Sequence, residues 1–194
     1  MEKVSYSLGL SVAGNLLKSG VNDLDQEAFA RGIKHGLGEG NVEMSSQEVN
    51  HILNDYFTKI QNQAGSENLA EGEAFLKENS KKDDVVSLES GLQYSVLVEG
   101  KGPKPKATDK VKCHYHGTLI DGNVFDSSVE RGTPAVFPVN GVIAGWVEAL
   151  QLMNVGSKWK LFIPSNLAYG ERGAGEQIGP NTTLIFEVEL LGIE

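Results

Sequence analysis

A set of aromatic side chains in the second half of the chain could line a binding pocket, with a carboxylate among them. The aromatic residues are Tyr115, Phe125, Phe137, Trp146, Tyr169 and Phe186. Because large aromatic side chains are most often buried, their types alone predict a packed core. Asp126 directly follows Phe125. A buried aspartate needs hydrogen-bond partners, whereas an aspartate in a turn would simply cap the residues that follow. The residue types therefore leave a core and a pocket open as alternatives.

Other motifs give weaker chemical signals. His114 and His116 lie on one face of a predicted strand and could form a metal pair. No third ligand is apparent, so a solvated face is favoured, and we expect neither a metal nor a cofactor. The glycine-rich stretch 173–179 superficially resembles a phosphate-binding loop, but it lacks the required spacing and the lysine. Cys113 is predicted to be an inert core residue beside Tyr115.

Composition limits the class of protein. The chain has 194 residues, enough for one large domain or two small ones, and 40% of them are hydrophobic. The net charge of −9 argues against a surface for nucleic acid or for an anionic membrane. No apolar run approaches the roughly 20 residues of a membrane span, and the first residues lack the apolar core of a signal peptide. We expect a cytoplasmic protein, or a periplasmic one if a signal peptide was removed.

The first part of the chain has the apolar periodicity of amphipathic helices. We predict Asp23 as the N-cap of a second helix and a capping box of Ser45 with Glu48 at the start of a third. The third helix has the apolar stripe Val49, Ile52, Leu53, Tyr56, Phe57 and Ile60. A helical unit this small buries too little apolar surface to form a core of its own. A second copy of the chain is therefore expected to cover the apolar stripe. The alternative is packing against the C-terminal domain.

The positions of the aromatic residues depend on the elements that follow. Residues 61–82 are polar and helical again after a possible break at Gly65, and a helix unbroken over 46–79 would span about 50 Å. From Val85 the period changes to two, which is typical of strands. The predicted strands cover 92–98, 110–116, 133–139, 158–163 and 183–191. With one short helix over 142–150, they predict an α+β domain whose antiparallel sheet curls over that helix.

The order and spacing of these residues resemble the catalytic domain of FKBP-type peptidyl-prolyl cis-trans isomerases. The resemblance covers the chain from about Ser90 onward and rests on the stretches 124–128, 141–150, 168–170 and 184–190. The helical part resembles the dimerisation region of the two-domain bacterial members, the Mip-like or FklB-like isomerases. The resemblance thus implies a dimerisation domain over 1–60, a stalk helix or linker over 61–82, and an isomerase domain over 83–194.

The resemblance also implies a role for each candidate site residue. Trp146 would be the floor of the pocket, and Asp126 would bond to the Tyr115 hydroxyl and to Arg131. The catalytic residues implied are Tyr115, Phe125, Asp126, Ile143, Trp146, Tyr169 and Phe186. Those implied for substrate or macrolide binding are Arg131, Phe137, Val142 and Ile178. The sequence departs from the commonest family pattern at Ala135, where an aromatic residue usually lines the pocket, and at Ala174 and Gln177, so a wider and less apolar mouth is expected.

The implied activity is the acceleration of proline-limited protein folding, without a nucleophile, acid or metal. An aromatic pocket would strip water from the X-Pro amide and so favour its twisted transition state. The implied partners are proline-containing peptides, unfolded protein chains, the macrolides tacrolimus and rapamycin, and a second copy of the chain. The alternative is a dimeric folding chaperone or holdase in which isomerase activity is secondary.

Overall fold

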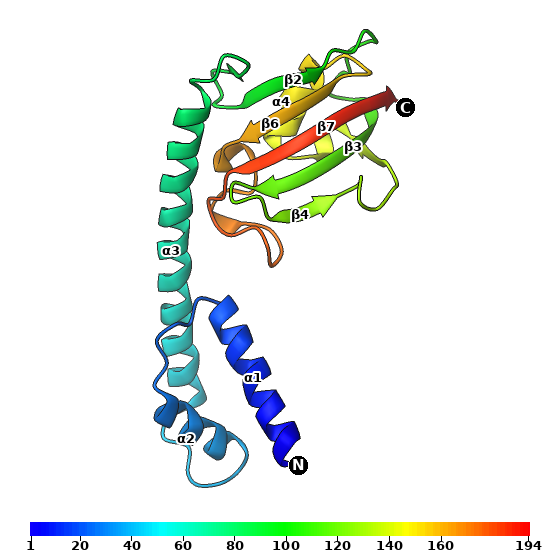
Figure 1. Cartoon of the computed structure of the whole chain (residues 1–194). Coiled ribbons are helices and arrows are strands. Elements are labelled where there is room, and N and C mark those ends of the chain that lie inside the picture. The colour runs from blue at the N-terminus through cyan, green and yellow to red at the C-terminus, as the bar shows by residue number, and fades with distance from the viewer. The chain divides into compact units, whose positions relative to one another are not determined.

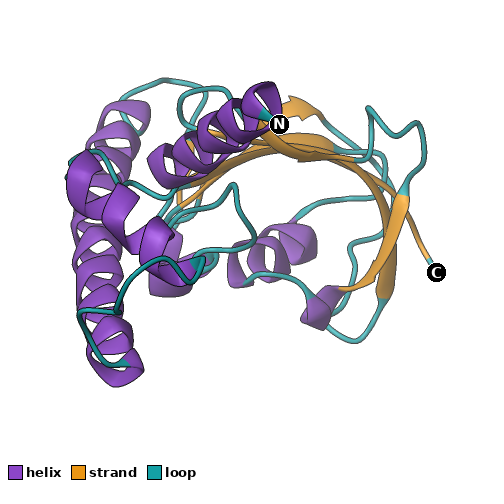
Figure 2. Cartoon of the chain, turned by 90° about the horizontal axis from the view of Figure 1, so that it is seen from below, coloured by secondary structure: helices purple, strands orange, loops and turns teal.

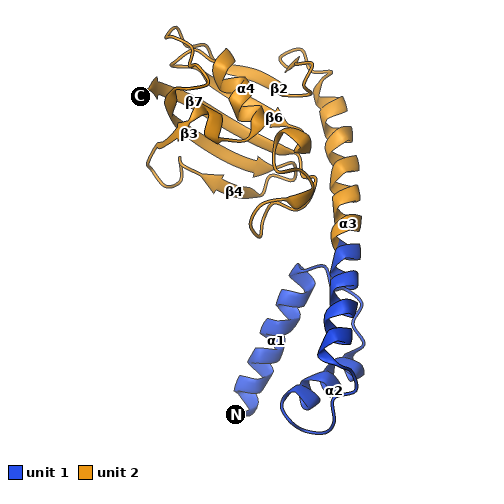
Figure 3. Ribbon diagram, turned by 180° about the vertical axis from the view of Figure 1, so that it is seen from behind, with its two compact units in different colours: residues 1–60 blue, residues 61–194 orange.

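The computed structural model describes residues 1–194, which form two compact units, residues 1–60 and residues 61–194 (Figure 3). The helix α3, Ser46–Asn79, contributes residues to both units. It is continuous through Gly65, so the possible break predicted there is absent. No helix of the chain has the combined length and apolar character needed to cross a membrane.

The first unit holds α1 (Glu2–Lys18), α2 (Gln26–Gly36) and the beginning of α3. The capping box at the start of α3 is confirmed, because the Ser45 N–H donates to Glu48 Oε2 at 2.8 Å and the Glu48 N–H donates to Ser45 Oγ at 3.2 Å. The prediction that Asp23 caps α2 is wrong. Asp25 is the N-cap and accepts from the N–H groups of Glu27 and Ala28. Two aspartates of equal capping propensity precede this helix, and local pattern does not distinguish them.

The first unit has almost no core of its own. No residue of α1 or α2 is buried. Val21, between these helices, is the buried hydrophobic residue of the unit. Apolar side chains are instead exposed to solvent, as shown by Leu8 at 62%, Ile52 at 52% and Leu53 at 46%. Within a single chain, the apolar stripes predicted from the sequence therefore lie largely uncovered.

The second unit is built on an antiparallel sheet (Figure 1). Its strands are β1 (Val86–Ser87), β2 (Gln93–Val98), β3 (Lys110–Leu119), β4 (Val124–Ser127), β5 (Ala135–Pro138), β6 (Lys158–Ile163) and β7 (Leu184–Ile193). The order is β1-β2-β6-β7-β3-β4, and β5 pairs with β3. The helix α4, Ala144–Leu152, follows a 3-10 turn at Val139–Gly141. Figure 2 shows the sheet curved around α4, so the predicted α+β fold is confirmed.

The long strand β3 shows why the sheet forms. Its side chains alternate as predicted: Val111, Cys113 and Tyr115 are buried, and the lysine and histidine residues between them are more exposed. A period of two places all the apolar side chains on the face that covers α4. Loss of hydration on burial raises the pKa of the Cys113 thiol to about 12, which fits an unreactive core residue.

The second part of α3, residues 61–79, belongs to the same compact unit as the sheet. The rings of Phe75 and Phe162 lie with their centroids 6.0 Å apart. The buried Asn79 donates from Nδ2 to Gln93 Oε1 at 2.9 Å, and Gln93 Nε2 donates to the Leu76 carbonyl oxygen at 2.9 Å. This part of the helix is therefore held to the sheet by both apolar and hydrogen-bonded contacts.

Candidate functional site

A cavity of about 790 Å³ opens between the concave side of the sheet and the loop that follows β6. It brings together almost all the site residues named from the sequence: Tyr115, Phe125, Asp126, Phe137, Val142, Ile143, Trp146, Tyr169, Ile178 and Phe186. Arg131 does not line the cavity and instead contacts two residues that do. Elements far apart in the chain, from β3 to β7, thus contribute to one site.

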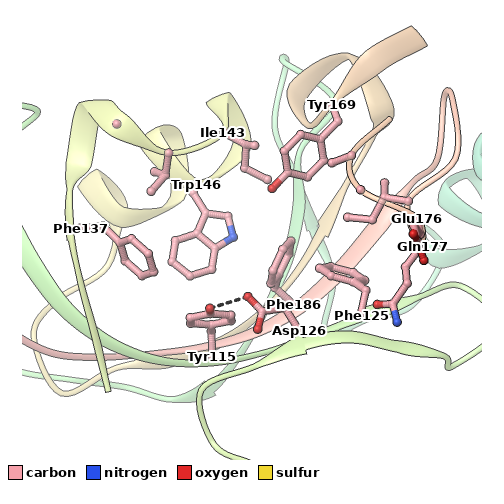
Figure 4. A pocket seen from close by; sticks show the side chains of 15 residues that line it. Tyr115, Phe125, Asp126, Phe137, Ile143, Trp146, Tyr169, Glu176, Gln177 and Phe186 are labelled. Carbon is pink, nitrogen blue, oxygen red and sulfur yellow. Dashed lines mark hydrogen bonds between the residues drawn. The ribbon is translucent and has the colours of Figure 1, made fainter. Parts of the chain in front are cut away.

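Trp146, in the first turn of α4, forms the floor of the cavity and is only 4% exposed. The rings of Phe137, Tyr115 and Phe186 surround its indole (Figure 4). Each of these rings meets the indole edge to face, with centroids 5.3 to 5.8 Å apart. Such contacts stabilise aromatic clusters beyond the area that they bury. The indole nitrogen Nε1 is buried and has no hydrogen-bond partner.

Beside this floor lies a closed polar network. The Tyr115 hydroxyl donates to Asp126 Oδ2 at 2.6 Å, and Arg131 donates to the Tyr115 oxygen at 2.8 Å. A second Arg131 nitrogen pairs with Asp126 Oδ1. These are the neighbours that the family resemblance implied for Asp126. Pairing between β3 and β4 brings these strands together, since Gly117 lies opposite Asp126.

Gly117 is required by this packing. A Cβ atom at this position would lie 2.7 Å from Phe125 Cζ and 2.8 Å from Phe186 Cε1. Both rings are walls of the cavity. A larger residue would therefore push the two walls apart, which explains why a strand interior carries a residue of poor strand propensity.

The network sets the charge of the site. Partial burial acts to raise the pKa of Asp126, but hydrogen bonds from Tyr115 and Arg131 outweigh it and hold the pKa below its usual value. Burial, followed by the hydrogen bond to Asp126, raises the pKa of the Tyr115 hydroxyl. At neutral pH the carboxylate is therefore ionised and balanced by Arg131, and Tyr115 keeps its proton.

The mouth of the cavity is formed by the loop between the 3-10 turn at Gly170–Arg172 and β7. Ala174 and Ile178 pair through two backbone hydrogen bonds of 2.8 and 3.2 Å. Ala174 and Gln177 line the mouth as expected, whereas Ala135 does not line the cavity. Ala135 lies in β5 opposite Cys113 and packs against the hydrophobic core.

The cavity is also lined by Gly141, Gly175 and Glu176, which were not predicted from the sequence. Glycine and glutamate residues carry no sequence pattern that distinguishes a site from a solvated surface. The remaining polar motif, His114 with His116, is engaged in hydrogen bonds, because each Nδ1 atom lies 3.0 Å from a serine Oγ. The chain has no group of three or more histidine, cysteine, aspartate or glutamate side chains placed to hold a metal ion.

Comparison with known proteins gives matches to a single protein family. Residues 102–191 match the family model described as FKBP-type peptidyl-prolyl cis-trans isomerase, and residues 1–96 match the domain amino terminal to it. The FKBP-type 22 kDa peptidyl-prolyl cis-trans isomerase of Escherichia coli is 50% identical, over 98% of this chain and 94% of that protein. Outer membrane protein MIP of Legionella longbeachae is 40% identical, over 100% of this chain and 85% of that protein.

A solved structure agrees with these sequence matches. The crystal structure of FkpA from Escherichia coli superposes with a TM-score of 0.75 at 35% sequence identity. The match covers 99% of this chain and 95% of that one. The likeness therefore extends to the helices as well as to the sheet.

Proposed function

Because this chain belongs to the family of FKBP-type peptidyl-prolyl cis-trans isomerases, we propose that its aromatic cavity is where an X-Pro bond is bound and twisted. The observation that carries this proposal is the buried Trp146 floor, ringed by aromatic walls, beside a carboxylate whose charge Arg131 balances. The proposal is tested by the rate of cis-trans exchange of a short prolyl peptide.

Rotation about a prolyl amide is slow because resonance gives its C–N bond partial double-bond character, with a barrier of about 18–20 kcal/mol. Resonance also places negative charge on the oxygen and positive charge on the nitrogen, and water stabilises this separation. Within walls formed by Trp146, Phe137 and Phe186, the planar amide would lose that stabilisation. The twisted transition state has less charge separation and loses less, so the cavity binds it in preference to the ground state.

Polar groups at the edge of the cavity would orient the substrate. The backbone N–H of Ile143 stands at the N-terminus of α4 and makes no hydrogen bond within the chain. A helix N-terminus favours acceptors, so this group suits a substrate carbonyl oxygen. The Tyr169 side chain is 41% exposed, and its hydroxyl points into the cavity (Figure 4). It would donate to a second carbonyl.

This mechanism moves no proton, and it therefore predicts a flat pH profile. The folded-state pKa of Asp126 is lowered, so the stability it contributes is present above the unfolded value of about 3.9 and is lost as pH falls through the folded value. The raised pKa of Tyr115 keeps that hydroxyl protonated well above neutrality. We expect kcat/KM to be constant from about pH 5 to about pH 9. A bell-shaped profile near neutral pH would instead indicate general acid–base catalysis.

Tacrolimus and rapamycin should occupy the same cavity, because their pipecolinyl ring mimics proline over Trp146. We expect titration with either macrolide to change tryptophan fluorescence and to inhibit peptide exchange. Affinity should be lower than in relatives with an aromatic residue at position 135. Trp159 contributes background from outside the cavity, where it stacks on Tyr94 at 4.1 Å. Trp159→Phe should therefore keep the signal, and absence of binding at high micromolar macrolide would contradict the cavity assignment.

The exposed apolar residues of the first unit support a homodimer. Leu8, Ile52 and Leu53 are each close to half exposed or more in the single chain. Burial of a large apolar side chain contributes roughly 1.5–3 kcal/mol, so several of them on each chain would offset the entropy lost on association. A second copy of the chain, packed through the helices of residues 1–60, is the occupant that we propose for this surface.

A folding chaperone, or holdase, is the second candidate function. The favouring observation is the extent of the exposed apolar surface, because the part of it that a dimer leaves uncovered could bind unfolded chains. An aggregation-suppression assay distinguishes the two readings when it is run beside the peptide assay. If a variant that has lost peptide exchange still suppresses aggregation, the holdase role is independent of isomerisation. If such a variant loses both activities, isomerisation is primary.

We propose two candidate compartments, the cytoplasm and the cell envelope. The name of one relative, outer membrane protein MIP, supports an envelope location. Fractionation of cells that express the native gene decides between them, with a cytoplasmic and a periplasmic marker enzyme as references.

A further inference from the structure

A face of α3 lies against the segment that connects the cavity mouth to β7. Gly65, Asn68 and Gly72 succeed one another along this face at helical spacing. A Cβ atom on Gly72 would lie 2.2 Å from Thr183 Oγ1, and one on Gly65 would lie 3.2 Å from Asn181 Nδ2. Glycine is therefore what allows the helix backbone to approach residues 180–183 so closely. In Figures 1 and 3 this part of α3 runs beside the loop that enters β7.

Two asparagines fasten the helix and the loop to each other. Asn68 on the helix donates from Nδ2 to the Pro180 carbonyl oxygen at 2.8 Å. Asn181 on the loop donates from Nδ2 to the Gly65 carbonyl oxygen at 3.3 Å. Each side chain thus bonds to the backbone of the other segment, and the pair acts as a reciprocal clamp.

Asn181 also reaches the walls of the cavity through its backbone. Its N–H donates at 2.8 Å to the carbonyl oxygen of Gly170, the residue after Tyr169. Asn181 has a φ of 55°, and it is the only residue other than glycine with positive φ. This conformation is unfavourable for most L-residues; asparagine tolerates it better than most, and contacts with the surrounding structure hold it in place. Here the bonds to Gly65 and Gly170 supply those contacts.

The other end of the clamp adjoins a second wall of the cavity. Gly179 follows Ile178, which lines the cavity mouth. A Cβ atom on Gly179 would lie 3.1 Å from Asn68 Nδ2, so the helix packs directly behind this point of the loop. A displacement of residues 179–181 from α3 would therefore move Ile178 and Tyr169 together.

We propose that Asn181 is a positioning residue for the isomerase: its side chain holds the cavity mouth against α3 and so fixes Tyr169 and Ile178 for substrate binding. The proposal rests on the cavity being the prolyl site. Because the clamp orders walls that contact the substrate before the amide twists, it acts on KM more than on kcat. The helix of residues 61–79 thereby supports the binding site, although none of its residues lines the cavity.

The test compares variants of the full-length protein. Asn181→Asp keeps the shape and the tolerance of positive φ, but it places a carboxylate oxygen opposite the Gly65 carbonyl oxygen. Asn181→Gly relieves the backbone and removes the bond. We expect both to raise KM for a short prolyl peptide about threefold to tenfold, with kcat within about twofold of the parent. The matched control is Asn62→Asp, at an exposed asparagine on the same helix, which should leave KM unchanged.

A third variant, on the helix side of the clamp, and a second readout make the result decisive. Asn68→Ala breaks the bond from the helix side and should raise KM in the same way. Amide hydrogen exchange should become faster at Ala174 and Ile178 in all three clamp variants, even if peptide turnover is not detected. An active parent whose clamp variants keep the parent KM and exchange rates overturns the proposal. An inactive parent instead counts against the cavity as the prolyl site, and hydrogen exchange then still tests the clamp.

Discussion

Asp126→Ala should lower kcat/KM for a short peptide with an apolar residue before proline by about tenfold to about a hundredfold. The change leaves the Tyr115 hydroxyl without its acceptor at 2.6 Å and deprives Arg131 of its ion pair. Unpaired polar groups at the wall of an apolar cavity attract water. Water in the cavity would stabilise the planar amide again and restore the barrier.

Two controls separate this effect from a general loss of charge or of fold. Asp84→Ala removes an exposed carboxylate from the same unit and should leave kcat/KM unchanged. Tyr115→Phe keeps the ring against Trp146 and removes only the hydroxyl, so it should cost less than Asp126→Ala. If Asp126→Ala turns over as fast as Asp84→Ala, the role assigned to Asp126 is wrong.

Replacing Leu53 and Phe57 together with aspartate should convert a dimer into a monomer of the chain mass, 20.9 kDa. Leu53 is 46% exposed in the single chain, and both residues lie on the apolar stripe of α3. An interface that used them would lose roughly 1.5–3 kcal/mol for each side chain, and it would also have to bury carboxylates without partners. Sedimentation or light scattering gives the mass.

The control places the same charges one residue further along the helix. Asn54→Asp with Thr58→Asp has the same spacing, on exposed polar positions, and should remain a dimer. Turnover of short peptides should stay near the parent value in the Leu53 and Phe57 variant, because the cavity lies in the second unit. Refolding of proline-limited protein substrates should slow, since paired sites hold a long chain better than one. A parent protein that runs as a monomer contradicts the dimer.

Five of the seven strands were predictable because their signal is local, whereas β1 and β4 were not among the predicted strands. Alternation along β3 needs only neighbouring residues, and the buried set of Val111, Cys113 and Tyr115 follows from it. The beginning of α2 was not predictable to the residue, because Asp23 and Asp25 both have the side chain of an N-cap. The continuity of α3 through Gly65 could not be predicted either. Glycine is disfavoured inside a helix, and the contact of Gly65 with Asn181 cannot be seen in the sequence.

The site could be predicted from the sequence less completely than the fold. Tyr115 and Trp146 are core residues by burial and cavity walls by position, so their residue types cannot distinguish the two roles. The family resemblance supplied that distinction. The clamp at Asn181 has no local signal at all, because the bond from Asn68 to Pro180 joins residues 112 positions apart. Contacts of that kind appear only once the chain is folded.

The most direct test of the central claim, that this cavity isomerises prolyl bonds by desolvation, is an NMR exchange measurement on a short peptide with an apolar residue before proline. The full-length protein, at a small fraction of the peptide concentration, should accelerate cis-trans exchange in proportion to its amount. The acceleration should be the same across neutral pH and should fall at least about tenfold in Asp126→Ala. Exchange no faster than in buffer, or acceleration undiminished in Asp126→Ala, would contradict the account.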